Sequence, residues 1–260
     1  METGYSNHIN ISANNAAPTV QQVFEQVKCE LLLTARRGEN VLITLIVPVV
    51  LLIFFTSLNL APKIGGSTIN FLLPGILALA IIAAGMVNLG IATAYERHYG
   101  VLKRLGSSPL SRSGLISAKV ISILILELLQ VIMLVGVAIA LYGWRPAGSP
   151  LMALLTIVLG TVTFAGLGLA MAGALRAEIT LAGANALYLV FLLIGGGLVP
   201  VSRLPVLLAD FAQLLPATAL TQALQATMTN GSSFPLTSLI VLAVWAVAIL
   251  LVATRTFKWE

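Results

Sequence analysis

Polar side chains are rare inside the long apolar segments of this chain, and one of them is a carboxylate. Glu127 is the acidic residue that lies clearly within such a segment, and the other notable polar groups there are Asn88, Gln130 and Asn185. A charged carboxylate at the centre of a bilayer costs about 2.5–3.5 kcal/mol on insertion scales. In one interpretation Glu127 lines a path for a translocated molecule, or a subunit interface, and contacts a polar or cationic group. In the other it is protonated, or paired with an asparagine of a neighbouring helix.

The two asparagines are kept with Glu127 as candidate residues of a translocation path. For both Asn88 and Asn185, however, hydrogen bonding between helices is the favoured role, because amide side chains commonly join helices in membranes. The sequence leaves the role of Glu127 open.

The remaining reactive residue types are too few or too scattered for a catalytic or metal-binding site. Cys29 is the one cysteine, and the two histidines, His8 and His98, lie on different segments. No phosphate-binding sequence of the form GxxxxGKS or GxxxxGKT occurs, and no pair of carboxylates in the apolar segments has the spacing of a di-metal or proteolytic site. The sequence therefore predicts no catalytic residue, no metal and no cofactor bound by this chain.

Residues 95–119, YERHYGVLKRLGSSPLSRSGLISAK, form the longest strongly polar run between apolar segments. Basic residues near the ends of membrane spans favour the cytoplasmic side. The interior of the run predicts a short amphipathic helix, in which Val101, Leu102 and Leu105 are apolar and residues 106–109 form the stop. We expect Leu105 to be the most exposed of the three and to contact a soluble partner. An ordinary basic loop is the alternative. The basic residues of the run are Arg97, Lys103, Arg104, Arg112 and Lys119.

The composition identifies the class of protein that must position these residues. Of 260 residues, 58% are hydrophobic and only 9% are charged, and the mean hydropathy is +1.02. Soluble domains carry about 25% charged residues, so we expect an all-α integral membrane protein. The net charge of +5 belongs to cytoplasmic loops in such a protein and does not indicate nucleic-acid binding.

The order of apolar and polar segments predicts one transmembrane domain at 19–260, preceded by a polar cytoplasmic tail at 1–18. Residues 19–37 have the helical spacing of an amphipathic helix lying on the membrane surface. Residues 204–228 are predicted to form short outer-surface or re-entrant helices, with a seventh, kinked span as the alternative. Glycines at 160, 166, 168 and 173 offer close helix contacts. The six predicted spans are 41–60, 71–94, 113–142, 151–175, 179–198 and 235–253, each close to the length that crosses a bilayer.

The distribution of positive charge predicts the orientation of these spans in the cell membrane. With both termini in the cytoplasm, eleven of the fourteen Lys and Arg residues lie on the inner side. The outer side then holds only Lys63, Arg145 and Arg203. Lys119, near the inner end of the third span, is expected to extend its ammonium group to the membrane interface.

One part of the polar run resembles a known family. The sequences ERHYGVLKRL at 96–105 and SPLS at 108–111 are similar to the E-R-x-x-G-T-L-K-x-L…S-P-L-S pattern in permease subunits of type-2 ATP-binding-cassette exporters. That group includes bacterial drug, polysaccharide and lipid exporters. Val101 stands where threonine is common. Further similar features are Pro48, the pair at 74–75, and the proline- and glycine-rich region 196–216. The resemblance extends from the amphipathic helix to the last span.

This resemblance implies a coupling helix between the second and third spans, which docks into a groove on a separate ATPase subunit. ATP and Mg would bind that partner and not this chain. A second permease protomer, identical or homologous, would complete the membrane part, and residues 19–37 would be the interfacial connecting helix. Glu96 and Arg97 would orient the coupling helix, and Gly100 would allow its close approach. The residues implied in coupling are Glu96, Arg97, Gly100, Val101, Leu102, Lys103, Arg104, Leu105 and Pro109.

The expected function is therefore that of an ATP-driven export permease that works by alternating access and catalyses no reaction itself. The spans hold few aromatic and polar residues, which favours a lipophilic drug, lipid or lipid-linked compound as substrate. The alternatives are an ion-coupled secondary transporter, which would need ion or proton sites and usually shows internal repeats, and a non-transporting membrane signalling protein. A membrane-embedded enzyme would need clustered catalytic residues, and the sequence has none.

Overall fold

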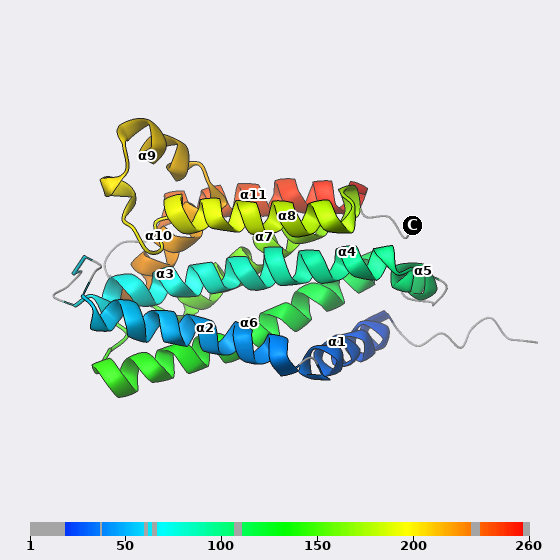
Figure 1. Ribbon diagram of the computed structural model, residues 1–260, viewed down its shortest axis with the longest axis horizontal. Coiled ribbons are helices and arrows are strands. Elements are labelled where there is room, and N and C mark those ends of the chain that lie inside the picture. Colours follow the sequence, from blue (N-terminus) through cyan, green and yellow to red (C-terminus); the bar gives the residue numbers. More distant parts are fainter. Residues whose placement is uncertain are drawn as a thin grey trace, which may run out of the picture.

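A computed structural model describes residues 19–36, 38–59, 62–63, 67–106, 111–229 and 235–256 of the chain. All the regular elements of these ranges are helices, so the predicted all-α class is confirmed. The long helices lie side by side in one elongated bundle (Figure 1). In chain order, the long and short helical elements are α1 (Thr19–Arg36), α2 (Gly38–Ser57), α3 (Ile69–Ile82), η1 (Ala83–Leu89), α4 (Gly90–His98), α5 (Val101–Gly106), α6 (Arg112–Tyr142), α7 (Pro150–Ala174), α8 (Ala177–Ile194), η2 (Val201–Arg203), α9 (Val206–Gln213), α10 (Pro216–Thr229) and α11 (Leu236–Thr256).

The centre of the bundle is a single helical rod made of α3, η1 and α4. It runs without a break from Ile69 to His98, and it is the most buried of the long apolar helices. Its middle section, η1, is a π-helix, which is an uncommon element that often occurs at functional sites. In Figure 1, α2 and α6 lie on one side of this rod, and α8 and α11 lie on the other.

Within the described ranges, five helical segments are long and apolar enough to cross a membrane. Besides the central rod they are α6, α7, α8 and the part of α11 at Leu236–Ala253. The predicted first span corresponds to α2, whose apolar part, Leu42–Ser57, is shorter than the other five. Many large apolar side chains on the outer faces are exposed, for example Ile132 on α6 and Leu193 on α8. Such faces suit a hydrocarbon environment.

Small residues bring α7 against the central rod and α11, as the sequence predicted. A Cβ atom added to Gly168 would lie 2.7 Å from the carbonyl oxygen of Gly85, so the two backbones are in direct contact. Gly160 and Gly166 likewise leave room for side chains of α10 and α11, namely Leu220 and Ile249. Close backbone approach of this kind is how helices associate where lipid removes the usual hydrophobic driving force.

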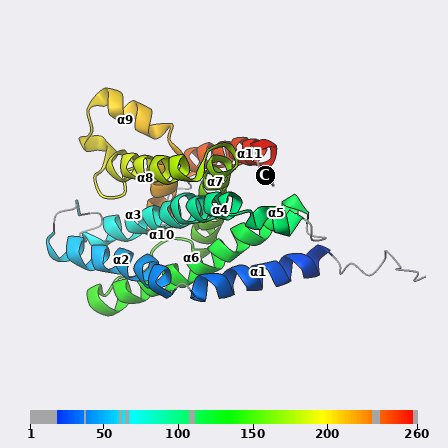
Figure 2. The same ribbon diagram turned by 45° about the vertical axis from the view of Figure 1, so that its right-hand side comes forward.

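One end of the bundle, which we call the α9–α10 end, holds two helices that differ sharply in burial (Figures 1 and 2). Of the side chains of α9, only Ala212 is buried. In contrast, α10 packs among α3, α7 and α11, and ten of its fourteen residues are buried. The segment 204–228 therefore contains one peripheral helix and one that enters the bundle.

The opposite end, which we call the α1–α5 end, carries the polar run. Here α1 packs against the first half of α6, and α5 follows the turn at Tyr99 and Gly100. A small apolar cluster joins them, in which Leu102 of α5 and Leu115 of α6 are completely buried. Ser111 begins α6 by accepting a hydrogen bond from the backbone N–H of Gly114, at 3.1 Å.

Candidate functional site

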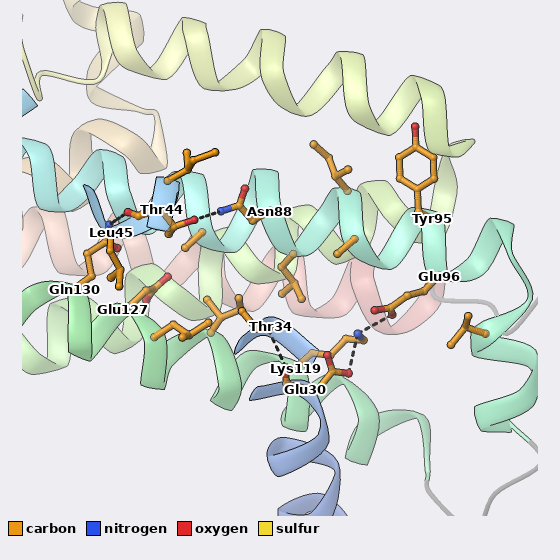
Figure 3. A pocket seen from close by; sticks show the side chains of 18 of the residues that line it. Glu30, Thr34, Thr44, Leu45, Asn88, Tyr95, Glu96, Lys119, Glu127 and Gln130 are labelled. Carbon is orange, nitrogen blue, oxygen red and sulfur yellow. Dashed lines mark hydrogen bonds and ion pairs between the residues drawn. The ribbon is translucent and has the colours of Figure 1, made fainter. Parts of the chain in front are cut away.

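A cavity of about 490 Å³ opens between the central rod, α1, α2 and α6 (Figure 3). It runs from Tyr99 and Val101 at the α1–α5 end to Thr44 and Gln130 inside the bundle. Most of its wall is apolar. Sites for small molecules typically have volumes of about 300–1,000 Å³ and apolar walls with a few placed polar groups. This cavity has both properties, and it contains two of the three residues that the sequence proposed for a translocation path.

Glu127 lies in the wall of this cavity and is 1% exposed. The hydroxyl group of Thr161, on α7, donates a hydrogen bond to Oε2 of Glu127. The other carboxylate oxygen, Oε1, has no hydrogen-bond partner among the described residues. The alternative that paired Glu127 with an asparagine is therefore wrong, because its partner is a threonine. That threonine satisfies only half of the carboxylate.

Gln130, one turn beyond Glu127 on α6, has a structural explanation. Pro48 has no N–H, so the carbonyl group of Thr44 in α2 lacks the partner that a regular helix would supply four residues later. The side-chain amide of Gln130 donates to that carbonyl oxygen at 2.7 Å. A proline inside a membrane helix is tolerated when a neighbouring helix satisfies the freed group in this way.

The two candidate asparagines lie in different surroundings. Asn88, at the end of η1, lines the cavity and donates to the hydroxyl of Thr44 at 3.4 Å, so it joins two helices as expected. It is exposed, not buried. Asn185 lies on an exposed face of α8 and donates to the carbonyl of Leu181 in its own helix. The structure thus brings Asn88 and Glu127 to one cavity and leaves Asn185 outside it.

The charged end of the cavity is organised by Lys119. Its ammonium group lies 2.9 Å from a carboxylate oxygen of Glu30 on α1 and 2.7 Å from one of Glu96 on α4. Its side chain is 1% exposed, so it is buried between helices and does not lie on the outer surface of the bundle. Two carboxylates hold it inside, and this bridge joins α1, α4 and α6 (Figure 3).

Arg97, the neighbour of Glu96, ties the same end of α4 to α7. Its guanidinium group donates to the carbonyl oxygens of Gly173 and Leu175, in the last turn of α7. Those carbonyls have no partner within the helix, and the helix dipole favours a cation there. Glu96 and Arg97 therefore hold α4 to α6 and α7 directly, and to α1 through Lys119.

The short helix α5 presents a different face from the one expected. Leu102 is completely buried and Leu105 is half-buried against the apolar cluster at this end. The expectation that Leu105 is the most exposed apolar residue is wrong, because the protein itself covers it. The exposed apolar groups are the 71% exposed Tyr99 and the 40% exposed Val101.

The remaining residues of the polar run divide into three cases. Gly100 has nothing within 4 Å of where a Cβ would lie, so no residue in the described part of this chain packs closely against it. Instead its φ of +70° is the left-handed conformation that glycine adopts most easily at a turn. Lys103 and Arg104 are exposed. Pro109, which the sequence assigned to the end of the coupling helix, lies outside the described residues.

Two partners in this site were not predicted from the sequence, namely Glu30 and Thr161. Glu30 sits in a helix predicted to lie on the membrane surface, where carboxylates are ordinary. Thr161 is one of several threonines on α7. A hint was present in Glu127 itself, because a buried carboxylate requires a donor on a neighbouring helix.

The long apolar helices and their exposed apolar faces indicate a multi-pass membrane protein, and its internal cavity has the size of a small-molecule site. The model of the family described as ABC-2 type transporter matches residues 21–229. The chain therefore belongs to the ABC-2 type transporter family, as the resemblance in residues 96–111 implied. Permeases of this family generally work with ATPase subunits. A comparison with curated proteins gives no match.

Proposed function

We propose that this chain is the permease subunit of an ATP-driven exporter of lipophilic compounds. In this proposal α2 is a sixth span beside the five longer ones, and both termini are cytoplasmic in the cell membrane. The α1–α5 end faces an ATPase subunit that binds ATP and Mg. Two permease protomers, identical or homologous, form the membrane part, and the cavity beside Glu127 alternates between the two sides of the membrane.

The observation that carries this proposal is the way the polar run is tied into the bundle. Glu96 and Arg97, at the end of α4, connect directly to α1, α6 and α7 through Lys119 and the last carbonyls of α7. A displacement of α5 by a partner would therefore act on four long helices together. The same connections border the cavity, since Glu30, Glu96 and Lys119 line it.

In this proposal α5 is the coupling helix, and its contact surface is formed by Tyr99 and Val101 with the exposed basic side chains beside them. Leu102 and Leu105 hold the helix to the permease. The amphipathic α1 lies at the inner membrane surface, with Val20 and Leu32 among its exposed apolar residues. In this proposal, each apolar residue of α5 contacts either the permease core or the ATPase.

The test is site-specific cross-linking in the complex with the ATPase that co-purifies with the chain. In a Cys29→Ala background, Tyr99→Cys should cross-link to cysteines placed in the ATPase groove, and the yield should change when ATP is added. The matched control is Leu207→Cys, which is 86% exposed on α9 at the opposite end and should not cross-link. If no groove position reacts with Tyr99→Cys while the complex still transports, α5 is not the coupling helix.

A further inference from the structure

We propose that the cavity beside Glu127 binds lipophilic monocations, such as hydrophobic amines and quaternary ammonium or phosphonium ions. This inference names the substrate class of the transporter proposed above, and it rests on that function only for the role of the cavity in transport. The binding itself follows from the charges and surfaces of this chain.

The first observation is the charge of the cavity wall. Among the described residues of the wall, the carboxylates are those of Glu30, Glu96 and Glu127, and the basic group is that of Lys119. Lys119 is already held by Glu30 and Glu96 at 2.9 Å and 2.7 Å. It also lies eight residues from Glu127 on α6, which is about 12 Å along a helix. The ammonium group therefore does not neutralise Glu127, and the carboxylates of the described part of the wall outnumber its one basic group.

The second observation is the free oxygen of Glu127. Oε2 accepts a hydrogen bond from the hydroxyl group of Thr161, but Oε1 has no hydrogen-bond partner among the described residues. The Glu127 side chain is only 1% exposed to solvent. An uncompensated carboxylate is costly at such a place. A proton or a bound cation at Oε1 removes that cost. A monocation entering the cavity takes the place of the proton and leaves the charge of the site balanced.

The third observation is the nature of the rest of the wall. Around Glu127 the wall is apolar, with Ile91, Ile123 and Leu126 among its residues. An organic cation with an apolar body fits this combination, because the carboxylate favours the charge and the apolar wall favours hydrocarbon.

The path extends beyond Glu127. A second cavity of about 160 Å³ borders Pro48, Leu79 and Tyr188, and it shares Thr44, Asn88 and Gln130 with the first. The polar residues where the two cavities meet form hydrogen bonds with one another and carry no net charge. Glu127 is thus the carboxylate of the deep part of the path, which makes it the specific test of the proposal.

The experiment uses the full chain in lipid nanodiscs and two ions of nearly the same size and shape, tetraphenylphosphonium and tetraphenylborate. Equilibrium binding of each radiolabelled ion is measured, with empty nanodiscs subtracted. The wild-type protein should bind the cation saturably and not the anion. Glu127→Gln should weaken cation binding by at least about tenfold, because it removes one partner of a buried charge pair. Glu127→Asp, which keeps the charge, should retain it.

The matched control is Glu178→Gln, the same chemical change at an exposed position of α8, which should bind the cation like the wild type. Equal binding of the two ions, no saturable cation binding, or unchanged binding in Glu127→Gln would each overturn the proposal. The comparison of the two ions on the wild type needs no variant, so it decides the matter even where a variant fails to fold. No ATPase is present, so this result is independent of the cross-linking at Tyr99.

Discussion

At the scale of single residues, Lys119 shows how burial changes what a charged side chain does. On a surface an ion pair is worth about 0–1 kcal/mol, because water and salt screen it. Lys119 is 1% exposed and bridges Glu30 and Glu96, which are only 14% and 20% exposed. Removing one partner of a buried pair leaves charge without compensation, and the typical cost is about 3–5 kcal/mol.

We therefore predict that Lys119→Met lowers the thermal stability of the protein strongly, because two carboxylates are then left facing each other. Thermal unfolding in detergent measures this. The control is Lys28→Met, which breaks the exposed pair with Glu25 (2.9 Å) and should change stability by less than about 1 kcal/mol. The double variant Glu96→Gln, Lys119→Met should recover part of the loss. Equal effects of the two lysine changes would show that burial of the bridge is not what matters.

The sequence placed these residues in the right region but not in the right contacts. The polar run and Glu127 were singled out from composition and local spacing, which are properties of short segments, and the residues proposed for coupling came from the family resemblance. The bridge of Lys119 depends on three helices meeting at one point, and Glu30 is distant in the chain. The burial of Leu102 and Leu105 likewise depends on which surface α5 packs against, and a short amphipathic pattern does not distinguish the protein's own core from a partner.

At the scale of elements, α2 and α6 are joined by a hydrogen bond that replaces one missing from the backbone of α2. Pro48 interrupts the hydrogen bonding of α2, and Gln130 of α6 donates to the carbonyl of Thr44 that lost its partner. A typical hydrogen bond within a protein contributes about 0.5–1.5 kcal/mol to stability. The proline was predicted to bend the first span. The compensating donor could not be found from the sequence, because it required the pairing of α2 with α6.

We predict that Gln130→Leu destabilises the protein by about 0.5–1.5 kcal/mol, since it removes the hydrogen bond of 2.7 Å that the Gln130 amide donates to the Thr44 carbonyl. Pro48→Ala restores a backbone donor to the same carbonyl. In a double-mutant cycle measured by thermal unfolding, Gln130→Leu should therefore cost less in the Pro48→Ala background. Additive effects of the two changes would mean that Gln130 does not compensate for the proline.

At the scale of the whole molecule, the helix bounds lie close to the segments predicted from hydropathy, because long apolar runs limit where such helices begin and end. Two features of the fold could not be predicted from the hydropathy of local segments. One is α10, whose alanines and threonines are polar enough on average to suggest a surface, yet it packs between three helices. The other is the shortness of the apolar part of α2, which separates it from the five longer helices.

Orientation in the membrane is a property of the whole chain and can be tested as such. Reporter fusions after Ser67 and Ser232 should register outside the cell, and those after Ser108 and Glu260 should register inside. The reason is the excess of Lys and Arg on the side that holds the α1–α5 end. The fusion at Glu260 also serves as the internal standard for expression. An outside position for Ser108 would contradict both the orientation and the proposed docking of α5.

The π-helix η1 in the central rod determines how α4 is rotated about the rod axis relative to α3. A π-turn holds one residue more than an α-turn, so η1 shifts the register of α4 relative to α3. If residues 83–89 kept their number but formed a regular α-helix, everything beyond them would turn by about 100°, the rotation of one residue. The packing of α3 would be kept, but Glu96 would no longer face Lys119, and Arg97 would leave the end of α7. In this chain, the conformation of a seven-residue segment decides which way Glu96 and Arg97 point.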